Sequence, residues 1–337
     1  MADFRWALIG PGSIARRFAH AVRELPDARL AVVIGRNEAR ARAFADEWCE
    51  PGPTRVGTDL MELLRTRDVD GVYIATPHAF HAEEAVRCLR AGLPVLCEKP
   101  LAANLAQARM LAETSRTLGV FLMEALWTRF LPAYETVGEW LSAGRIGPLR
   151  AIQSSFCFNV PFDASTRHFD PHQAGGALLD IGVYNLATAQ WALTLANGAA
   201  PRLDEVVAEM KPAASGVDAA MTATLRFVGD AHLQFRCGFD AVADNALRLI
   251  GERGVITVPE HFWEGTAATL RIGDGPVERV ERPFAINGFE GEILEAMACI
   301  RAGRQESARM PLDDTLAVTE WSDAIRRHVG LRYPFEQ

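Results

Sequence analysis

The first 125 residues of this 337-residue chain alternate between short apolar runs and amphipathic segments. The apolar runs predict strands at residues 4–9, 29–34, 72–75, 94–98 and 120–123. Between them, apolar residues recur at helical spacing and predict helices at 13–23, 38–48, 59–67, 79–91 and 105–118. Strands that are continuous apolar runs, each followed by a helix, are typical of a parallel sheet covered on both faces. We therefore expect a doubly wound α/β domain over residues 1–124.

The pattern changes after residue 125. Two helices are predicted at 128–143 and 176–196, and two more close the chain at 288–302 and 312–329. Between these pairs, strand-like segments follow one another with little helix, at 205–210, 219–227, 231–237, 246–250, 254–258 and 268–272. Successive strands of this kind predict a large, open and mostly antiparallel sheet. We expect residues 125–337 to form a second, α+β domain.

Composition and charge exclude several classes of protein. The chain is 49% hydrophobic and 23% charged, and its 35 basic and 43 acidic residues give a net charge of −8. Without a long basic run, neither nucleic-acid binding nor a polybasic membrane patch is expected. No apolar stretch has the length of a signal peptide or a membrane span, so we expect a cytoplasmic protein.

The cysteines and histidines do not predict a metal site. None of the six cysteines forms a C-x-x-C pair or has zinc-like spacing with the eight histidines. His168 and His172 flank Pro171 in a loop without a convincing third ligand. We expect no metal, and cysteines that are small buried side chains in a reducing compartment.

A glycine-rich turn follows the first predicted strand. It reads Gly10-Pro11-Gly12-Ser13-Ile14-Ala15 and matches the pattern G-x-G-x-x-A. The first glycine permits a tight turn, the second lets the backbone approach a pyrophosphate, and the following helix N-terminus faces the phosphates. Because the motif lies between a strand and a helix, we predict that this turn binds a dinucleotide. The alternative is a structural turn that uses glycine only for its φ angle.

The end of the second strand bears on the choice of dinucleotide. An acidic residue there would hydrogen-bond the ribose of NAD, whereas arginine accommodates the 2′-phosphate of NADP. The chain has Arg36 and Asn37 at this tip, and Arg40 follows one turn later. We therefore expect NADP rather than NAD, with Arg36 as a planar partner for phosphate. Arginines that only face solvent are the alternative.

The predicted strand 94–98 ends abruptly at Glu98-Lys99-Pro100. In open α/β sheets, ligands bind outside the carboxyl ends of the strands. We expect the Lys99 ammonium to point into such a cleft, where it would stabilise a developing alkoxide. A solvated surface turn is the alternative.

Asp180 and Tyr184 are spaced i, i+4 on a predicted helix and would share one face. Oxidation of an alcohol needs a base at the hydroxyl proton, and a nearby ammonium would lower the pKa of a tyrosine toward that task. Asp180 would then orient Tyr184 or the substrate hydroxyl, or balance the lysine charge. A surface pair is the alternative.

Several segments together resemble the glucose–fructose oxidoreductase / inositol dehydrogenase (Gfo/Idh/MocA) family. These segments are Thr76-Pro77-His78-x-x-His81, the helix end Ala91-Gly92, and Glu98-Lys99-Pro100. Residues 123–130 and 175–184 are similar to the dimeric dihydrodiol dehydrogenase branch, which also oxidises D-xylose with NADP. Tyr184 stands where other branches carry histidine, and agrees with this branch.

The resemblance implies a Rossmann domain, an open-sheet domain and a role for each matching residue. Lys99 would lie at the substrate carbon beside the nicotinamide. Asp180 and Tyr184 match a second-domain motif whose aromatic or imidazole group would exchange the substrate proton. Trp127 and Arg129 would line the cleft between cofactor and substrate, and Arg167 would contact substrate. The cofactor site would further include Ala75, Thr76, Pro77, His78 and Glu98. We expect a structural role for His81.

The expected function is transfer of a hydride between NADP and a hydroxyl or carbonyl carbon of a cyclic diol or sugar. Trp127, Phe284 or Phe289 would stack on the substrate ring. Redox-assisted glycoside hydrolysis and a non-catalytic nucleotide-sensing regulator remain alternatives on the same fold. The resemblance also implies a homodimer formed through the open sheet.

Overall fold

The computed structural model describes residues 3–49 and 54–336. The chain forms two compact units. The first comprises Met1–Trp127 and Ala285–Leu312, and the second comprises Thr128–Phe284 and Asp313–Gln337. This division differs from the expected domains of 1–124 and 125–337, because a segment near the C-terminus packs with the first unit.

The first unit contains a six-stranded sheet in the order β3-β2-β1-β4-β5-β6. Every neighbouring pair is parallel, which confirms the expected doubly wound sheet. The strands are β1 (Phe4–Ile9), β2 (Ala28–Ile34), β3 (Arg55–Gly57), β4 (Gly71–Ile74), β5 (Val95–Glu98) and β6 (Leu122–Ala125). The strand order reverses between β1 and β4, and ligands of such sheets bind at the carboxyl end of this switch point.

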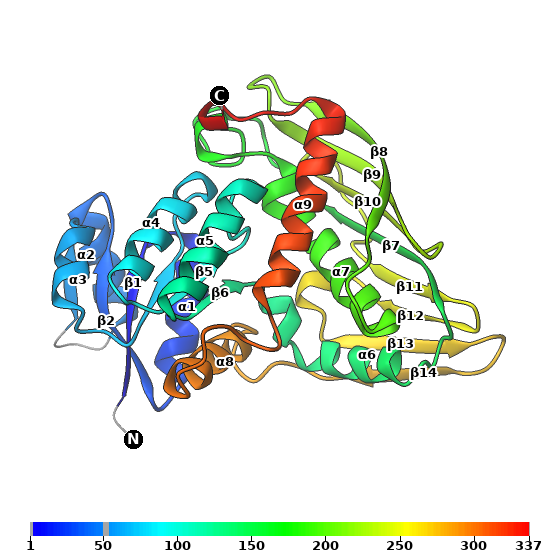
Figure 1. The fold of residues 1–337 in the computed structure, drawn as a ribbon, viewed down its shortest axis with the longest axis horizontal. Helices are drawn as coiled ribbons and strands as arrows, with labels where there is room; N and C mark the ends of the chain where they lie inside the picture. Colours follow the sequence, from blue (N-terminus) through cyan, green and yellow to red (C-terminus); the bar gives the residue numbers. More distant parts are fainter. Residues whose placement is uncertain (1–2, 50–53, 337) are drawn as a thin grey trace. The chain divides into compact units, whose positions relative to one another are not determined.

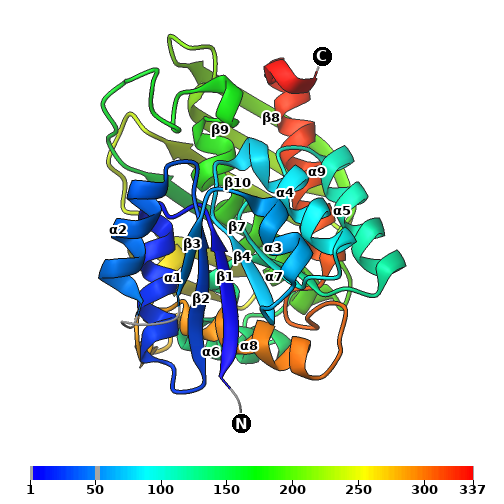
Figure 2. The ribbon, with the colours of Figure 1, turned by 90° about the vertical axis from the view of Figure 1, so that its left-hand side faces the viewer.

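Helices cover both faces of this sheet. Figure 2 shows α1 (Ser13–Glu24) and α2 (Glu38–Trp48) on one face, with α4 (His78–Arg90) and α5 (Leu105–Leu118) on the other. The short α3 (Leu60–Thr66) precedes β4. Phe18 of α1 stacks on Tyr73 of β4 with a centroid distance of 3.7 Å, so the two elements share the buried core.

The segment Ala285–Leu312 joins the first unit through α8 (Glu290–Arg301), which packs on α1. Arg301 forms an ion pair with Asp27 at 2.7 Å, and the Leu122 N–H donates to the Gln305 carbonyl at 3.0 Å. Helical periodicity predicts that a helix exists here, but it does not tell which core the helix completes. The expected domain boundary at residue 124 therefore left this C-terminal segment out of the first unit.

The second unit contains an eight-stranded sheet in the order β14-β13-β12-β11-β7-β10-β9-β8. Only the central β7–β10 pair is parallel, so the expected open and mostly antiparallel sheet is confirmed. The strands are β7 (Leu149–Cys157), β8 (Leu203–Pro212), β9 (Asp218–Phe227), β10 (His232–Gly238), β11 (Leu247–Gly251), β12 (Gly254–Val258), β13 (Ala267–Ile272) and β14 (Val277–Glu281). The sequence did not predict β3, β7 or β14.

Three helices lie along one face of this sheet in Figure 1: α6 (Pro132–Ser142), α7 (Val183–Asn197) and α9 (Leu312–Val329). Buried strand side chains such as Leu225 and Leu233 belong to the core of this unit. The expected single helix over 176–196 is wrong at its start. A π-helical turn, η3 (Leu178–Gly182), precedes α7 and carries Asp180. Such turns are frequent at functional sites.

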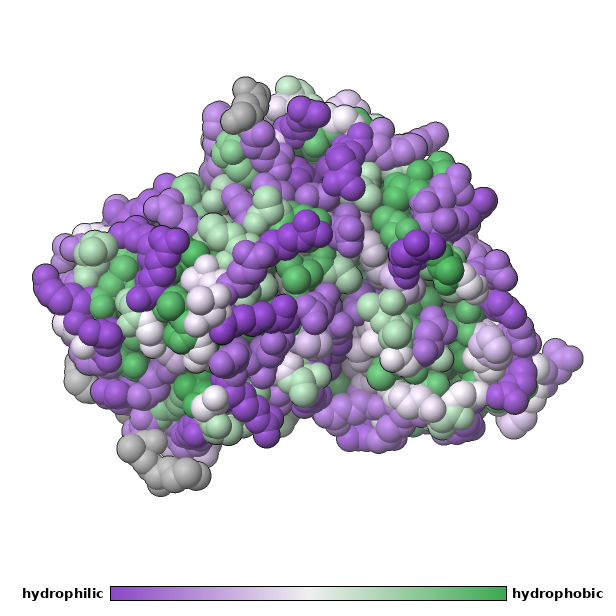
Figure 3. All heavy atoms as spheres, in the orientation of Figure 1, coloured by the Kyte–Doolittle hydropathy of each residue, from purple (hydrophilic) through white to green (hydrophobic). Residues whose placement is uncertain are grey.

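The surface is mainly hydrophilic on the side drawn in Figure 3, with hydrophobic residues in separate areas. Over residues 3–49 and 54–336, no helix is both long and apolar enough to cross a membrane. All six cysteines are free thiols, and five of them are buried.

Candidate functional site

The glycine turn after β1 fits a dinucleotide. Gly10 has a φ of +87°, and a Cβ there would lie 2.8 Å from backbone atoms of Ala75 and Thr76. The turn therefore packs directly on the loop that follows β4. Helix α1 begins after Gly12 with no side-chain cap and no acidic residue in its first turn. Its first amide groups and its dipole are suited to a pyrophosphate.

The tip of β2 carries exposed positive charge. The Arg36 side chain lies at the solvent surface, with its guanidinium carbon 5.9 Å from the centre of the Phe80 ring. Asn37 caps α2 by accepting a hydrogen bond from the Arg40 backbone N–H at 3.0 Å. Asn37 thus shapes the loop, while Arg36 and Arg40 are both exposed at this tip.

His81 bridges two loops at the carboxyl edge of the sheet. Its Nε2 lies 2.7 Å from the Thr76 carbonyl oxygen, and its Nδ1 lies 2.8 Å from the Pro100 carbonyl oxygen. The imidazole is fully buried, and burial lowers the pKa of His81. This arrangement gives His81 the expected structural role, because it joins the loop after β4 to the turn after β5.

Glu84 supports the same loop from α4. Thr76 donates its hydroxyl to Glu84 Oε2 at 2.5 Å, and burial raises the pKa of Glu84 to about 7.

The Glu98-Lys99-Pro100 turn is buried, which argues against a solvated surface turn. Lys99 is 9% exposed and Glu98 is 5% exposed. The Tyr73 hydroxyl donates to Glu98 Oε1 at 2.5 Å, and the Lys99 backbone N–H donates to Glu98 Oε2 at 3.2 Å. Lys99 follows the last residue of β5, at the edge where ligands of this fold bind. The glutamate thus fixes the backbone from which the lysine side chain projects.

In the second unit, a glycine pair brings Arg167 and Asp180 together. The Gly176 N–H donates to the His168 carbonyl at 2.8 Å, and a Cβ on Gly175 would lie 2.8 Å from the Arg167 carbonyl oxygen. This close backbone contact places Arg167 Nη1 at 2.9 Å from Asp180 Oδ1. Asp180 is therefore charge-paired within its own unit.

His168 is a neighbour of Asp180 that the sequence did not indicate. Its Nε2 lies 3.8 Å from Asp180 Oδ2. The sequence offered His168 only as a poor metal ligand. In the part of the chain that the structure describes, no three His, Cys, Asp or Glu side chains cluster in a way that could hold a metal.

Asp218 of β9 supports the turn that carries Asp180. Its Oδ2 accepts a hydrogen bond from the Leu178 N–H at 2.6 Å, at the start of the π-helical turn. Burial raises the pKa of Asp218 to about 7. Gly176 has a φ of +120°, and a Cβ at that position would overlap Asp218 Oδ1. The glycine is thus required by both its backbone angle and its neighbour.

Tyr184 lies in an aromatic cluster that the sequence analysis missed. Its ring packs on Phe156 at 5.6 Å, and Phe156 stacks on Trp263 with a centroid distance of 3.4 Å. Phe158 completes the cluster at 6.0 Å from Phe156. Phe156 and Phe158 lie two positions apart near the end of β7, a strand that the sequence did not predict. Their spacing alone did not distinguish them from core residues.

Two of the aromatic residues expected to stack on substrate, Trp127 and Phe289, lie together in the first unit. Trp127 and Phe289 are 3% and 1% exposed and pack on each other at 5.1 Å, with Arg17 over the indole ring at 4.4 Å. Arg129 forms an ion pair with Asp314 at 2.9 Å and donates to Gln190. Each residue thus has partners in its own unit, and its expected contribution to the cleft stays a prediction.

Models of one family match both units. An oxidoreductase family model with an NAD-binding Rossmann fold (GFO_IDH_MocA) matches residues 4–126. A GFO/IDH/MocA C-terminal domain model matches residues 134–257. The chain belongs to the Gfo/Idh/MocA family. It is therefore an NAD(P)-dependent oxidoreductase of a family that acts on alcohol and carbonyl groups.

Curated relatives of this Gfo/Idh/MocA protein match it over nearly its full length. It is 33% identical to the trans-1,2-dihydrobenzene-1,2-diol dehydrogenase of Danio rerio over 339 residues, covering 98% of each chain. It is 31% identical to the Homo sapiens enzyme of the same name over 340 residues, again covering 98% of each chain.

Solved structures agree with the family fold. A 3-ketoreductase from Actinomadura kijaniata, in complex with NADP and TDP-benzene, superposes with a TM-score of 0.85 at 27% identity, covering 97% of this chain and 98% of that one. An aldose-aldose oxidoreductase from Caulobacter crescentus, complexed with glycerol, gives a TM-score of 0.86 at 25% identity with the same coverage.

Proposed function

We propose that this protein is an NADP-dependent dehydrogenase that transfers a hydride between the nicotinamide and a hydroxyl or carbonyl carbon of a cyclic diol or sugar. The observation that carries the proposal is the buried Lys99 at the carboxyl end of β5, at the same edge of the sheet as a glycine turn suited to a dinucleotide. The relatives are named as a dihydrodiol dehydrogenase, a 3-ketoreductase and an aldose-aldose oxidoreductase. These names support a trans-dihydrodiol or a D-xylose-like sugar as substrate.

NADP is proposed over NAD because of the charge at the tip of β2. Arg36 and Arg40 are exposed there, and no acidic side chain occupies positions 36 or 37. A guanidinium pairs with the dianionic 2′-phosphate and gains little from a ribose hydroxyl. A crystallised relative contains NADP, which agrees with this choice.

Each residue would have a distinct part in the reaction. When bound, the cofactor supplies hydride acceptance at its nicotinamide ring. Lys99 would hold the substrate oxygen as negative charge develops on it, and Tyr184 would take the hydroxyl proton. Arg167 balances the charge of Asp180, so the aspartate would orient Tyr184 or a substrate hydroxyl through hydrogen bonding. The rings of Phe156, Phe158 and Trp263 would shape the apolar side of the site.

Turnover of a substrate panel tests the proposal. Trans-dihydrodiols, pentoses, hexoses and dicarbonyl compounds would be supplied with NADP or NAD, and the absorbance of the reduced nicotinamide would be followed. Lys99→Met is expected to lower kcat by at least about a hundredfold while leaving the Kd for NADP nearly unchanged. The matched control is Lys211→Met, because the chain has only two lysines and Lys211 pairs with Asp240 at the surface. Normal turnover in Lys99→Met would refute the proposal.

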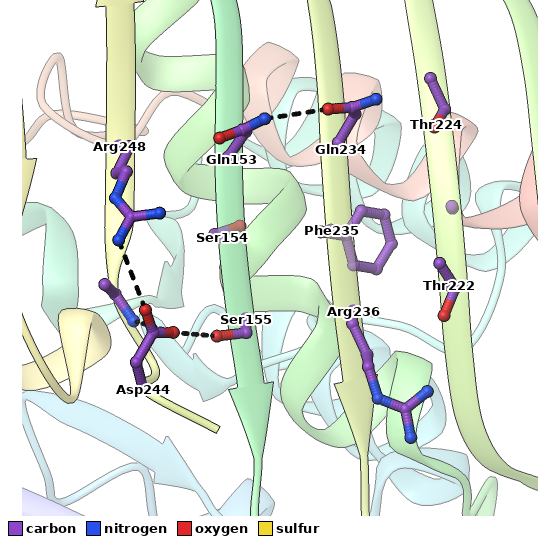
Figure 4. Close-up of a pocket in the computed structure, with 12 residues that line it drawn as sticks. Gln153, Ser154, Ser155, Thr222, Thr224, Gln234, Phe235, Arg236, Asp244 and Arg248 are labelled. Carbon is purple, nitrogen blue, oxygen red and sulfur yellow. Dashed lines mark hydrogen bonds and ion pairs between the residues drawn. The ribbon is translucent and has the colours of Figure 1, made fainter. Parts of the chain in front are cut away.

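We further propose a homodimer through the face of the eight-stranded sheet shown in Figure 4. The central strands there form a pocket of about 400 Å³ lined mainly by polar side chains. Gln153 donates to Gln234 across the β7–β10 pair, and Ser155 donates to Asp244. A second copy would cover this broad face. Light scattering should give twice the chain mass, and Gln234→Glu together with Thr222→Glu should lower it. A monomeric wild-type protein would refute the dimer.

A further inference from the structure

Glu292 is a buried acid with no visible partner. It is 0% exposed, and among the residues that the structure describes neither of its carboxyl oxygens has a hydrogen-bond partner. The other glutamates of α8 differ in this respect. Glu290 accepts hydrogen bonds from four backbone N–H groups of residues 285–288, and Glu295 accepts one from the Ser307 hydroxyl. A buried carboxylate without a partner is strongly unfavourable, so Glu292 is expected to keep its proton.

Two ionisable groups from other elements act on Glu292, and Glu292 acts on a third. Burial and the charge of Glu98 raise the pKa of Glu292 well above its ordinary value, and the Arg17 charge opposes them. Tyr73 is the third group, since both glutamates contribute to raising the pKa of its phenol. These groups come from β5, α1 and β4, respectively.

Glu98 is the member of this cluster that is arranged to carry charge. One of its oxygens accepts from the Tyr73 hydroxyl and the other accepts from the Lys99 backbone N–H. Two acceptor oxygens suit an ionised carboxylate. A second negative charge close to it would be repelled, so protonation of Glu292 and ionisation of Glu98 support each other.

We propose that Glu98 and Glu292 form a buried acid pair that holds one proton and one negative charge, the charge lying next to the Lys99 backbone. Glu292 is then a positioning residue, which acts on the lysine through Glu98. The single charge on Glu98 fixes the Lys99 backbone, while the proton on Glu292 prevents a second charge from distorting the turn. This inference rests on the proposed role of Lys99.

Unfolding as a function of pH tests the acid pair without any activity measurement. Glu292→Gln keeps the shape and the neutral form of the side chain but cannot ionise. Native wild-type protein holds a proton that the unfolded chain releases above a pH of about 4.3, so wild-type stability falls as pH rises above that value. Glu292→Gln does not lose stability in this way. The unfolding temperature of the variant minus that of wild type should therefore increase by roughly 5 °C from pH 5 to pH 8.

Glu295→Gln is the matched control on the same helix, because that carboxyl already has a hydrogen-bond donor. The unfolding temperature of Glu295→Gln relative to wild type should not increase from pH 5 to pH 8. Parallel pH curves for wild type and Glu292→Gln would overturn the acid pair. Should the variant fail to fold, infrared spectra of wild type at pH 8 decide the matter. The carbonyl band of a protonated carboxylic acid supports the pair, and its absence overturns it.

The positioning role has its own readout. The ratio of kcat for Glu292→Gln to kcat for wild type should increase with pH, because only wild type can gain a second negative charge near Glu98. The Kd for NADP should stay within about twofold, since the Glu292 side chain is 0% exposed. A flat ratio would overturn the positioning role. Normal turnover in Lys99→Met would instead refute the proposed function and leave the unfolding result valid.

Discussion

Replacement of Gly176 by alanine should be severely destabilising. Two separate effects act at this position. Its φ of +120° is a conformation that residues with a Cβ rarely adopt, and such strain costs about 1–3 kcal/mol. The new Cβ would also overlap Asp218 Oδ1 and disrupt the hydrogen bond from the Leu178 N–H, which contributes about 1.5–3 kcal/mol when the acceptor is charged. The expected loss is therefore about 3–6 kcal/mol.

Gly198→Ala is a matched control at the other end of α7. Gly198 has a φ of +74°, but a Cβ there would meet no atom within 4 Å. Only the left-handed backbone penalty of about 1–2 kcal/mol is expected for this variant. The difference between the two alanine variants isolates the overlap with Asp218.

Urea denaturation, followed by circular dichroism, measures the free energy of unfolding of both variants. The Gly176→Ala cost should also shrink in an Asp218→Ala background, because the overlapping carboxyl is then absent. In folded Gly176→Ala protein, kcat should fall while the Kd for NADP stays unchanged, since the turn carries Asp180 but lies outside the unit with the glycine turn. Equal costs for the two glycines, or a cost independent of Asp218, would refute the reasoning.

Two further predictions concern charge. Arg36→Ala should weaken NADP binding by about 10–100-fold and leave NAD binding nearly unchanged, as measured by calorimetry, because a charge-assisted contact to the 2′-phosphate is lost; equal losses for both cofactors would contradict it. Asp218→Asn should remove a dependence of stability on pH. The folded pKa of about 7 lies above the unfolded value of about 3.9, so wild-type stability falls by about 4 kcal/mol as pH rises from about 4 to 7 and then levels off. The free energy of unfolding of Asp218→Asn minus that of wild type should therefore be larger at pH 8 than at pH 5. An equal difference at both pH values would contradict the raised pKa of Asp218.

The sequence predicted the first sheet well because its strands are continuous apolar runs. β1, β2, β4, β5 and β6 were all expected, and each is buried on both faces. The second sheet was harder to predict. β7 contains Gln153, Ser154 and Ser155 at its centre, and β14 reads Val-Glu-Arg-Val-Glu at an exposed edge. Neither has the apolar pattern by which strands are recognised.

The candidate site also has residues that the sequence predicted and residues that it did not. Motifs predicted Lys99, Asp180 and the glycine turn, because their chemistry is visible in adjacent residues. The supporting residues are distant in sequence. Asp218 meets the turn at Leu178 from 40 positions away, and Glu292 acts on Glu98 from a segment assigned to the other domain. Long-range packing alone determines these contacts, and no local pattern encodes it.

These supporting residues share a property that bears on function. Glu84, Asp218 and Glu292 are carboxyls whose pKa is raised by burial. Glu84 and Asp218 each bond to a loop that carries a predicted site residue, and Glu292 interacts electrostatically with Glu98. Each reduces stability as pH rises from about 4 toward 7, because the native chain retains protons that the unfolded chain releases. Apolar side chains of similar volume would avoid that loss. Within their own units, these buried acids weaken the fold at neutral pH, yet they support the Thr76 loop and the Asp180 turn or act on Glu98. This favours a functional reason for their placement.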